Sequence, residues 1–274
     1  MEHYLDNKTI LITGAASGIG KRFAEKVSEF EGNTFILWDR NPDILKEIKE
    51  DLKERATVHI SGIDVMESAQ IQLESERLIK QGLVPDIILN CAGIVIGKFF
   101  HEQTKSEIER TISINTVGSM WVVRAFLNEM IERGSGHIVN IGSASGYIGN
   151  PRMSVYASSK WAVHGWSESL RLEMQKLETG IHVTTVIPSY IKTGMFDGVK
   201  APMLVPLLET DDIVDIMIHG ISRRKDKVQA PLMVRFVPLI KALLPASWFD
   251  WVAGNLLGVY KSMDSFKGRE PKSS

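Results

Sequence analysis

The sequence predicts an α/β protein in which a parallel β-sheet is covered by helices on both faces. Over the first 190 residues, short strand-like stretches alternate with longer helix-like stretches. The strand-like stretches are almost continuously apolar, which is typical of strands buried on both faces. The length of 274 residues is ample for a buried core. We expect one catalytic domain at residues 1–230 and an apolar helical extension with a frayed tail at 231–274.

The elements of the first half follow in order from their own stretches of sequence. "TILITG" (9–14) is a short apolar run that ends in Gly, and the helical pattern "GKRFAEKVSEFEG" (20–32) comes after it. The later elements here are a strand at 33–39, a charged helix from Pro42 to about Arg55, a strand at 56–64, a helix at 67–80 and a strand at 85–93. Strands separated by helices of this length indicate βαβ units.

The second half continues this alternation only to about residue 190. A helical region at 104–133, a strand at 136–143, a helix at 154–178 and a strand at 181–189 are expected. Beyond them, residues 189–209 mix turn residues with Met, Phe and Leu, which indicates a mobile apolar substrate loop. The extension is rich in large apolar residues and is interrupted by Pro238 and Pro245.

Composition excludes several classes of function. The net charge of −1 and the absence of a basic stripe argue against nucleic-acid binding. The single cysteine, Cys91, cannot form an internal disulfide, and we expect a cytoplasmic protein with no signal peptide and no transmembrane anchor. The seven histidines show no metal-ligand spacing, and "HEQTK" is not H-E-x-x-H, so no metal site is expected.

A glycine-rich turn joins the first strand to the first helix. "TGAASGIG" places Gly14, Gly18 and Gly20 there, although not in the G-x-G-x-x-G spacing. Glycines let a backbone approach a pyrophosphate, and the N–H groups of a helix N-terminus attract its charge. A tight turn that binds nothing fits these glycines equally well.

Asp39 favours the nucleotide-binding interpretation. It ends the second strand, where a carboxylate can accept hydrogen bonds from the ribose hydroxyls and would repel a 2′-phosphate. The sequence therefore predicts NAD, with NADP the less favoured cofactor. Arg40 next to it leaves the second choice open, since an arginine can accommodate that phosphate.

Tyr156 and Lys160 stand four residues apart in "VYASSKWAV", inside an expected helix. That spacing puts both side chains on one helix face. A free tyrosine, with a pKa near ~10, is a poor base at neutral pH, but a nearby cation favours the phenolate. An isolated pair of this kind is also common on solvated helix surfaces, so its meaning depends on context.

The context resembles the short-chain dehydrogenase/reductase family. The shared motifs are "TGAASGIG", "NCAG" after the fourth strand, a serine thirteen residues before Tyr156, and Y-x-x-x-K, in order over about residues 8–195. The resemblance implies a Rossmann-like doubly wound parallel sheet, a nicotinamide cofactor and hydride transfer to or from a carbonyl carbon. It also implies a homodimer or homotetramer built on the two long helices.

The resemblance implies roles for four catalytic residues. Tyr156 would be the general acid/base, and Lys160 would lower its pKa and hold the nicotinamide ribose. Ser143 would hydrogen-bond the substrate oxygen. Asn115 would hold a water that relays protons from Lys160, unless it is an ordinary polar helix residue.

The family pattern also implies a set of cofactor contacts. They are Thr13, Gly14, Ser17, Gly18, Ile19, Gly20, Asp39, Arg40, Asp64, Val65, Asn90, Ala92, Gly93, Tyr156, Lys160, Pro188, Ile191 and Thr193. The chain departs from the pattern twice, because Cys91 stands where a second asparagine is usual and Ser189 replaces a glycine. For Cys91, a small buried residue is favoured over a reactive thiol.

Four stretches resemble the retinol and 17β-hydroxysteroid dehydrogenase branch, whose substrates are lipophilic. They are "FILWDRN", "CAGIVIGK", "YIKTGMFDG" and the apolar extension. The expected substrate contacts are Ser143, Ser145, Ile94, Met195 and Phe196, with Met203 and Leu204 as further pocket residues. Packing of these apolar residues onto the core is an equally good interpretation.

Two questions stay open at this point, namely the role of the extension and the function of the protein. The extension is expected to be a lid or subunit interface in preference to a peripheral membrane contact. The leading function is NAD(H)-dependent interconversion of a lipophilic alcohol and its ketone or aldehyde. The alternatives are an NADPH-dependent carbonyl reductase, a non-catalytic nucleotide sensor, and a nucleotide-sugar epimerase or dehydratase, which the length disfavours.

Overall fold

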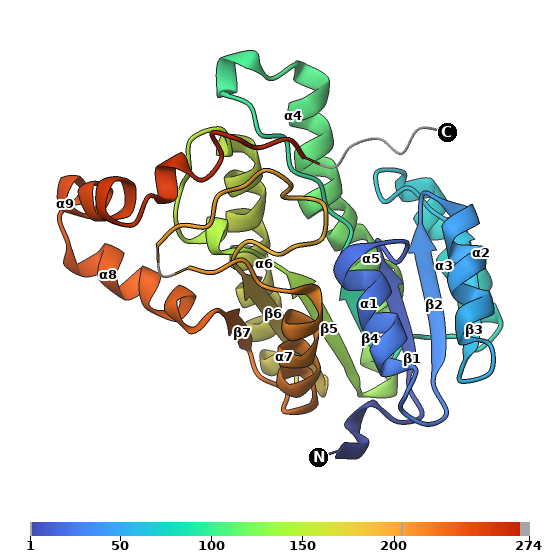
Figure 1. The fold of residues 1–274 in the computed structure, drawn as a ribbon. Helices are drawn as coiled ribbons and strands as arrows, with labels where there is room; N and C mark the ends of the chain where they lie inside the picture. Colours follow the sequence, from blue (N-terminus) through green and yellow to red (C-terminus); the bar gives the residue numbers. More distant parts are fainter. Residues whose placement is uncertain (1, 204, 269–274) are drawn as a thin grey trace.

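The computed structural model describes residues 2–203 and 205–268, so the predicted pocket residue Leu204 lies outside them. The described chain contains a seven-stranded parallel sheet of order β3-β2-β1-β4-β5-β6-β7 (Figure 1). The strands are β1 (Thr9–Thr13), β2 (Thr34–Asp39), β3 (Thr57–Gly62), β4 (Ile87–Asn90), β5 (Gly136–Ile141), β6 (Ile181–Pro188) and β7 (Lys227–Ala230). This order is doubly wound, because the chain runs outward from β1 to β3 and then crosses to β4 on the other side.

Nine α-helices connect and follow these strands within the described residues. They are α1 (Gly18–Val27), α2 (Pro42–Leu52), α3 (Ser68–Lys80), α4 (Lys105–Ile112), α5 (Gly118–Arg133), α6 (Ser154–Lys176), α7 (Thr210–Ser222), α8 (Val237–Leu243) and α9 (Ala246–Trp251). The shorter turns are η1 (Glu2–Leu5), η2 (Phe100–Glu102), η3 (Ser113–Val117), η4 (Ala144–Gly146), η5 (Leu232–Phe236), η6 (Val252–Leu256) and η7 (Val259–Lys261).

The helices cover both faces of the sheet, as predicted. Successive side chains of a strand point to opposite faces. In β1, Ile10 and Ile12 therefore pack into the core beneath α1, α2 and α7, whereas Leu11 packs into the core beneath α3, α5 and α6. Both cores lie within a single domain.

The seventh strand and the helix before it were not expected. The sequence analysis ended the sheet at residue 189, but α7 and β7 extend it by one βαβ unit. β7 has only four residues and begins with a lysine, so its sequence lacks the long apolar run that marks the other strands. It lies at the edge of the sheet, where one partner, β6, is enough.

The single helix predicted at 104–133 is interrupted. α4 starts at a capping box, in which Thr104 and Glu107 bond each other's backbone N–H groups. The π-helical turn η3 then separates α4 from α5. Such π-bulges occur frequently at functional sites, and this one contains Asn115.

The C-terminal extension forms a lobe that projects from the sheet (Figure 1). Its helices are short because a proline cannot lie in a helix interior. Pro238 lies in the first turn of α8, and Pro245 separates the end of α8 from the start of α9. No helix within residues 2–203 and 205–268 is both long and apolar enough to cross a bilayer.

Candidate active site

Tyr156 and Lys160 lie together on the first turns of α6, as their spacing predicted. Both side chains are buried, and the Lys160 ammonium nitrogen lies 5.7 Å from the centre of the Tyr156 ring. Lys160 Nζ also donates to the carbonyl oxygen of Ile141 at the end of β5, at 2.8 Å. The pair is therefore part of the protein interior, not of a solvated helix surface.

Burial changes the proton affinity of both groups. It raises the pKa of Tyr156, and a hydrogen bond with Ser143 opposes part of that rise. Burial lowers the pKa of Lys160 to about 8. Loss of water around the phenol has the largest effect, so the pKa of Tyr156 is raised overall and not lowered as expected, while the contribution of Lys160 itself stays a prediction.

Ser143 lies directly after β5, beside Tyr156. Its Oγ accepts the N–H of Ser145 at 3.1 Å and forms a hydrogen bond with the Tyr156 hydroxyl. Two hydroxyl groups that can donate to one substrate oxygen thus stand side by side. This is the arrangement required to protonate or stabilise a carbonyl oxygen as it gains charge.

His164 extends the same helix face, and the sequence analysis did not single it out. Its Nε2 accepts the backbone N–H of Ser143 at 3.4 Å. The ring fills the space beside Gly142 and Gly146, since a Cβ on Gly142 would lie 2.5 Å from Nε2. Burial lowers the pKa of His164 to about 4, so the ring is neutral and can accept. His164 lies four residues after Lys160, and this spacing could have placed it on the same helix face from the sequence alone.

Asn115, in the η3 turn, holds the loop after β4. Its Oδ1 accepts the N–H of Ile94 at 2.8 Å, and its Nδ2 donates to the Ile94 carbonyl at 2.9 Å and to Ser159 Oγ at 3.0 Å. Both amide hydrogens are thereby used, so the side chain has no further proton to donate. Any water held at this residue, as the sequence analysis predicted, must use its backbone carbonyl or the remaining Oδ1 lone pair.

The glycine turn forms a cradle that a side chain would fill. A Cβ on Gly14 would lie 2.8 Å from the Ala92 backbone, and one on Gly20 would lie 2.5 Å from the Gly14 carbonyl. Gly14 and Gly18 have positive φ, of 67° and 55°. α1 begins at Gly18 with no acidic residue in its first turn, so no carboxylate of that turn offsets the positive end of the helix. These features fit a bound pyrophosphate.

Asp39 lies at the carboxyl end of β2, beside this turn. Its Oδ2 accepts the Ala16 N–H at 3.1 Å and its Oδ1 accepts the Asn41 N–H at 3.0 Å. These bonds fix the carboxylate, while each oxygen keeps a lone pair for a hydroxyl group. Arg40 follows it and is exposed. The residues present therefore fit the ribose of a dinucleotide.

The ends of β1 and β4 are joined beneath the cradle. Thr13 Oγ1 accepts the N–H groups of Cys91 and Ala92, at 3.1 and 3.2 Å. Asn90 donates to Asn140 Oδ1 at 2.8 Å, and its own Oδ1 is buried without a partner. Burial raises the pKa of the Cys91 thiol to about 12, so the thiol is not a nucleophile at neutral pH.

The other predicted cofactor contacts surround the same carboxyl edge of the sheet. Asp64 and Val65 follow β3, where Asp64 Oδ1 accepts the Met66 N–H at 2.9 Å. On the opposite side Pro188 ends β6, and the loop after it brings Thr193 within contact distance of Gly18. Four predicted contacts remain. Ser17 precedes α1 and Ile19 is buried within it. Ile191 forms an isolated β-bridge with Leu208, and Gly93 faces Asn115 and Lys160.

A mainly apolar cavity of about 130 Å³ begins at Ser143. Ser143, Ser145 and Phe196 line it at the catalytic end, and Phe196 packs edge-on against Tyr156 at 6.0 Å. Side chains of the C-terminal extension form its far wall, namely Met233, Val234, Val237, Ile240, Phe249, Val252, Ala253 and Leu257. Two predicted substrate contacts, Ile94 and Met195, are not among its lining residues, and Met203 is exposed.

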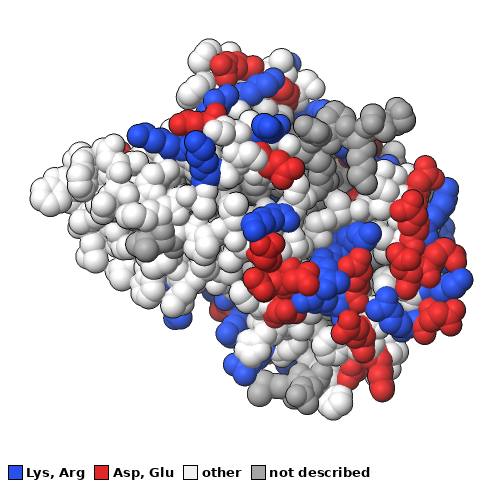
Figure 2. Space-filling model, viewed as in Figure 1, with Lys and Arg blue, Asp and Glu red and all other residues white. Residues whose placement is uncertain are grey.

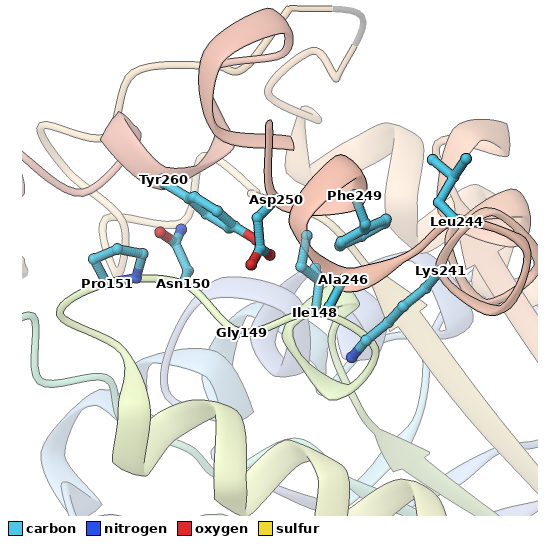
Figure 3. A pocket seen from close by; sticks show the side chains of 10 residues that line it. All are labelled: Ile148, Gly149, Asn150, Pro151, Lys241, Leu244, Ala246, Phe249, Asp250 and Tyr260. Atoms are coloured by element: carbon cyan, nitrogen blue, oxygen red, sulfur yellow. The ribbon is translucent and has the colours of Figure 1, made fainter. Parts of the chain in front are cut away.

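A second cavity, of about 520 Å³ and named here the outer cavity, adjoins the first, which is named the inner cavity (Figure 3). It opens between the loop at 148–151 and helices α8 and α9, and it shares Ile148, Asn150 and Phe249 with the inner cavity. Among the residues that the structure describes, no group of three His, Cys, Asp or Glu side chains is arranged to hold a metal ion.

Comparison with known proteins agrees with this geometry. The family model described as short chain dehydrogenase matches residues 8–203. Epidermal retinol dehydrogenase 2 of Mus musculus is 32% identical over 96% of this chain and 86% of its own length. Estradiol 17-beta-dehydrogenase 11 of Homo sapiens is 30% identical over 86% of this chain and 79% of its own.

Solved structures show the same fold. A short-chain dehydrogenase/reductase from Burkholderia phymatum in complex with NAD has a TM-score of 0.78 at 24% identity, covering 86% of this chain and 93% of that one. A short-chain dehydrogenase from Sphingobium yanoikuyae in complex with NADPH has a TM-score of 0.74 at 29% identity, covering 97% and 99%. The resemblance to the retinol and 17β-hydroxysteroid dehydrogenase branch is thus confirmed.

Proposed function

Because the chain belongs to the short-chain dehydrogenase family and is an oxidoreductase acting on CH–OH groups, we propose that it interconverts a lipophilic alcohol and its ketone or aldehyde with NAD(H). The observation that carries this proposal is the cavity that starts at Ser143 and is lined mainly by apolar side chains. A nicotinamide cofactor, when bound, supplies or accepts the hydride at the substrate carbon.

Tyr156 is the group that exchanges a proton with the substrate oxygen. Its raised pKa keeps the phenol protonated at neutral pH, ready to protonate a carbonyl oxygen. Ser143 donates a second hydrogen bond to the same oxygen. Lys160, with its pKa near 8, is largely protonated at neutral pH and stabilises the phenolate that is left.

The preference for NAD over NADP follows from Asp39. Its fixed carboxylate would accept ribose hydroxyls and repel a 2′-phosphate, which carries like charge. The runner-up is an NADPH-dependent carbonyl reductase. The exposed Arg40 next to Asp39 favours that second candidate, since its guanidinium is free to turn towards a phosphate.

The lipophilic substrate follows from the cavity walls. Apart from Ser143, Ser145, Asn150, Ser189 and the hydroxyl of Tyr190, the inner cavity is lined by apolar side chains. The Tyr190 hydroxyl and the Asn150 amide hydrogen-bond each other and Ser262. Among the described lining residues, Asn150 Oδ1 and Ser189 Oγ are the two buried side-chain atoms without a hydrogen-bond partner. A hydrophobic compound with its alcohol or carbonyl at Ser143 would leave few polar groups of the protein unpaired beyond these two.

Cofactor absorbance across a panel of alcohols and carbonyl compounds tests the proposal. Purified protein is assayed with NAD and NADP in parallel, beside a Tyr156→Phe variant. We expect turnover of hydrophobic alcohols with NAD and at least about a thousandfold loss in the variant. Equal turnover of short and hydrophobic alcohols would contradict the substrate class, and activity that survives in Tyr156→Phe would contradict the mechanism.

Two further expectations from the sequence remain predictions. They are a cytoplasmic location and assembly into a dimer or tetramer. Sedimentation velocity of the purified protein tests the second, since a monomer at micromolar concentration would contradict it.

A further inference from the structure

The C-terminal lobe, defined here as residues 232–256, exposes an unusual number of large apolar side chains. They are Leu232, Met233, Phe236, Leu239, Ile240, Leu243, Trp248, Trp251 and Leu256. Leu243, Trp248 and Trp251 are 72%, 68% and 58% exposed. Figure 2 shows the lobe as the uncharged projection on the left of the molecule. Contiguous apolar surface of this kind usually marks a site of contact with a protein or a membrane.

Little charge accompanies this surface. Arg235, Lys241 and Asp250 are the charged residues of the lobe. Lys241 is exposed, and its ammonium donates to the Tyr147 carbonyl at 3.1 Å and lies 4.8 Å from the Trp161 ring centre. Asp250 accepts the Tyr260 hydroxyl at 2.6 Å. The lobe thus exposes only three charged residues, of both signs, among nine large apolar side chains, and this surface complements an electrically neutral one better than a strongly charged one.

The lobe is also the outer wall of the substrate cavity. Met233 and Ile240 line the inner cavity and are at the same time exposed on the lobe surface. The outer cavity opens between the loop at 148–151 and α8 and α9, as Figure 3 shows with Phe249 and Leu244 above Ile148. A hydrophobic compound in contact with the lobe could therefore reach Ser143 along apolar side chains.

We propose that the C-terminal lobe inserts into the surface of a lipid bilayer, with Trp248 and Trp251 at the level of the headgroups, and that hydrophobic substrate enters from the lipid through the outer cavity. Tryptophan combines a large apolar ring with a polar N–H and is enriched at membrane–water boundaries. The projecting shape lets the lobe enter a bilayer while the sheet stays in water (Figure 1).

A second copy of this chain fits the lobe less well. A symmetric dimer must bury roughly 800 Å² on each protomer, and a lobe that projects from the body would bring only its own short helices to such an interface. A partner seated there would also cover the mouth of the outer cavity, which α8 and α9 form. The entry route rests on the proposed function, whereas lipid binding by the lobe does not.

Flotation with vesicles tests the lobe directly. Full-length protein is mixed with uncharged phosphatidylcholine vesicles in 0.15 M salt and separated on a density gradient, without cofactor or substrate. The test variant carries Leu243→Ser, Trp248→Ser and Trp251→Ser. The matched control carries Leu172→Ser and Leu177→Ser on α6, because these leucines are 52% and 64% exposed but lie outside the lobe.

We expect the wild type and the control to float with the vesicles and the triple variant to bind at least about tenfold more weakly. The fraction of protein bound to vesicles should change less than about twofold between 0.05 and 0.5 M salt, since binding depends on apolar area rather than charge. Brominated acyl chains should quench tryptophan fluorescence in the control and much less in the triple variant. Far-UV circular dichroism checks that all three proteins are folded.

Two results would overturn the proposal. One is a wild type that does not float, or a control that loses binding as strongly as the triple variant. The other is a wild-type dimer in sedimentation that the triple variant alone converts to monomers, which would assign the lobe to a second copy. Protein that floats but turns over no alcohol contradicts the proposed function alone. Protein that turns over hydrophobic alcohols but does not float contradicts the lipid surface alone.

Discussion

His164 Nε2 lies 3.4 Å from the backbone nitrogen of Ser143 and accepts its N–H. The imidazole fills the space beside Gly142 and Gly146, and its contact with both glycines restricts the conformation of the loop that carries Ser143. His164 does not contact the cavity, and we assign it as a positioning residue that acts through Ser143.

Replacing His164 tests this assignment. In His164→Leu the Ser143 N–H loses its acceptor, which costs roughly 1–2 kcal/mol when the group stays buried. We expect kcat to fall about tenfold while KM changes less than about twofold, because only the oxygen-binding geometry is disturbed. His164→Gln offers a carbonyl oxygen as acceptor and should recover most of the loss. Equal rates in the two variants would mean that the ring acts only by filling space.

The grouping of the expected catalytic residues at one place could be predicted from the sequence because its signals are local. Tyr156 and Lys160 are spaced by one helical turn, Ser143 ends a strand, and the glycine turn lies between the first strand and helix. The structure brings all of them to the carboxyl edge of the sheet. His164 lies four residues after Lys160, which is a local signal for the same helix face, but its contact with Ser143 depends on how α6 packs beside β5.

The pKa of Tyr156 and the elements α7 and β7 were less predictable from the sequence. Proximity of Lys160 suggested a lowered pKa for Tyr156, but the direction depends on how completely the phenol is desolvated, and burial raises it. α7 and β7 were missed because β7 is short and bears a charge at its start.

Asp39 should decide the choice of cofactor. Asp39→Ser removes the carboxylate that would repel a 2′-phosphate and leaves Arg40 in place. We expect the ratio of kcat/KM for NAD over NADP to fall at least about tenfold, equivalent to ~1.4 kcal/mol. Asp43→Ser, four residues further on at the start of α2, is the control and should leave the ratio unchanged. An unaltered ratio in Asp39→Ser would refute the role given to this carboxylate.

Lys160 should set the alkaline limit of carbonyl reduction. Because burial lowers its pKa to about 8, the ammonium is lost as the pH rises through that value. The phenolate that Tyr156 forms on giving up its proton then has no cation beside it. We expect kcat for reduction to decline above about pH 8, by roughly tenfold for each pH unit well beyond it. A profile measured with saturating cofactor that stays level to pH 10 would contradict this.

His137 should make the fold sensitive to acid. It is fully buried in β5, where its Nδ1 hydrogen-bonds the Tyr4 hydroxyl at 3.0 Å and its Nε2 hydrogen-bonds Thr184 Oγ1 at 2.7 Å. Burial lowers its pKa to about 3, whereas an unfolded histidine titrates near ~6.5. Between these values the unfolded chain binds the extra proton, so the free energy of unfolding falls as the pH falls.

The stabilisation that depends on neutral His137 is complete above pH ~6.5 and is lost progressively towards pH ~3, by an amount on the order of a few kcal/mol. His137→Gln keeps polar atoms at the site but does not titrate. We expect this variant to be less stable than the wild type at pH 7, yet to lose less free energy of unfolding in urea between pH 7 and pH 4.5. Exposed His219, changed to Gln, is the control. Equal acid sensitivity of His137→Gln and the wild type would assign the loss to other groups, foremost His164, whose pKa burial lowers to about 4.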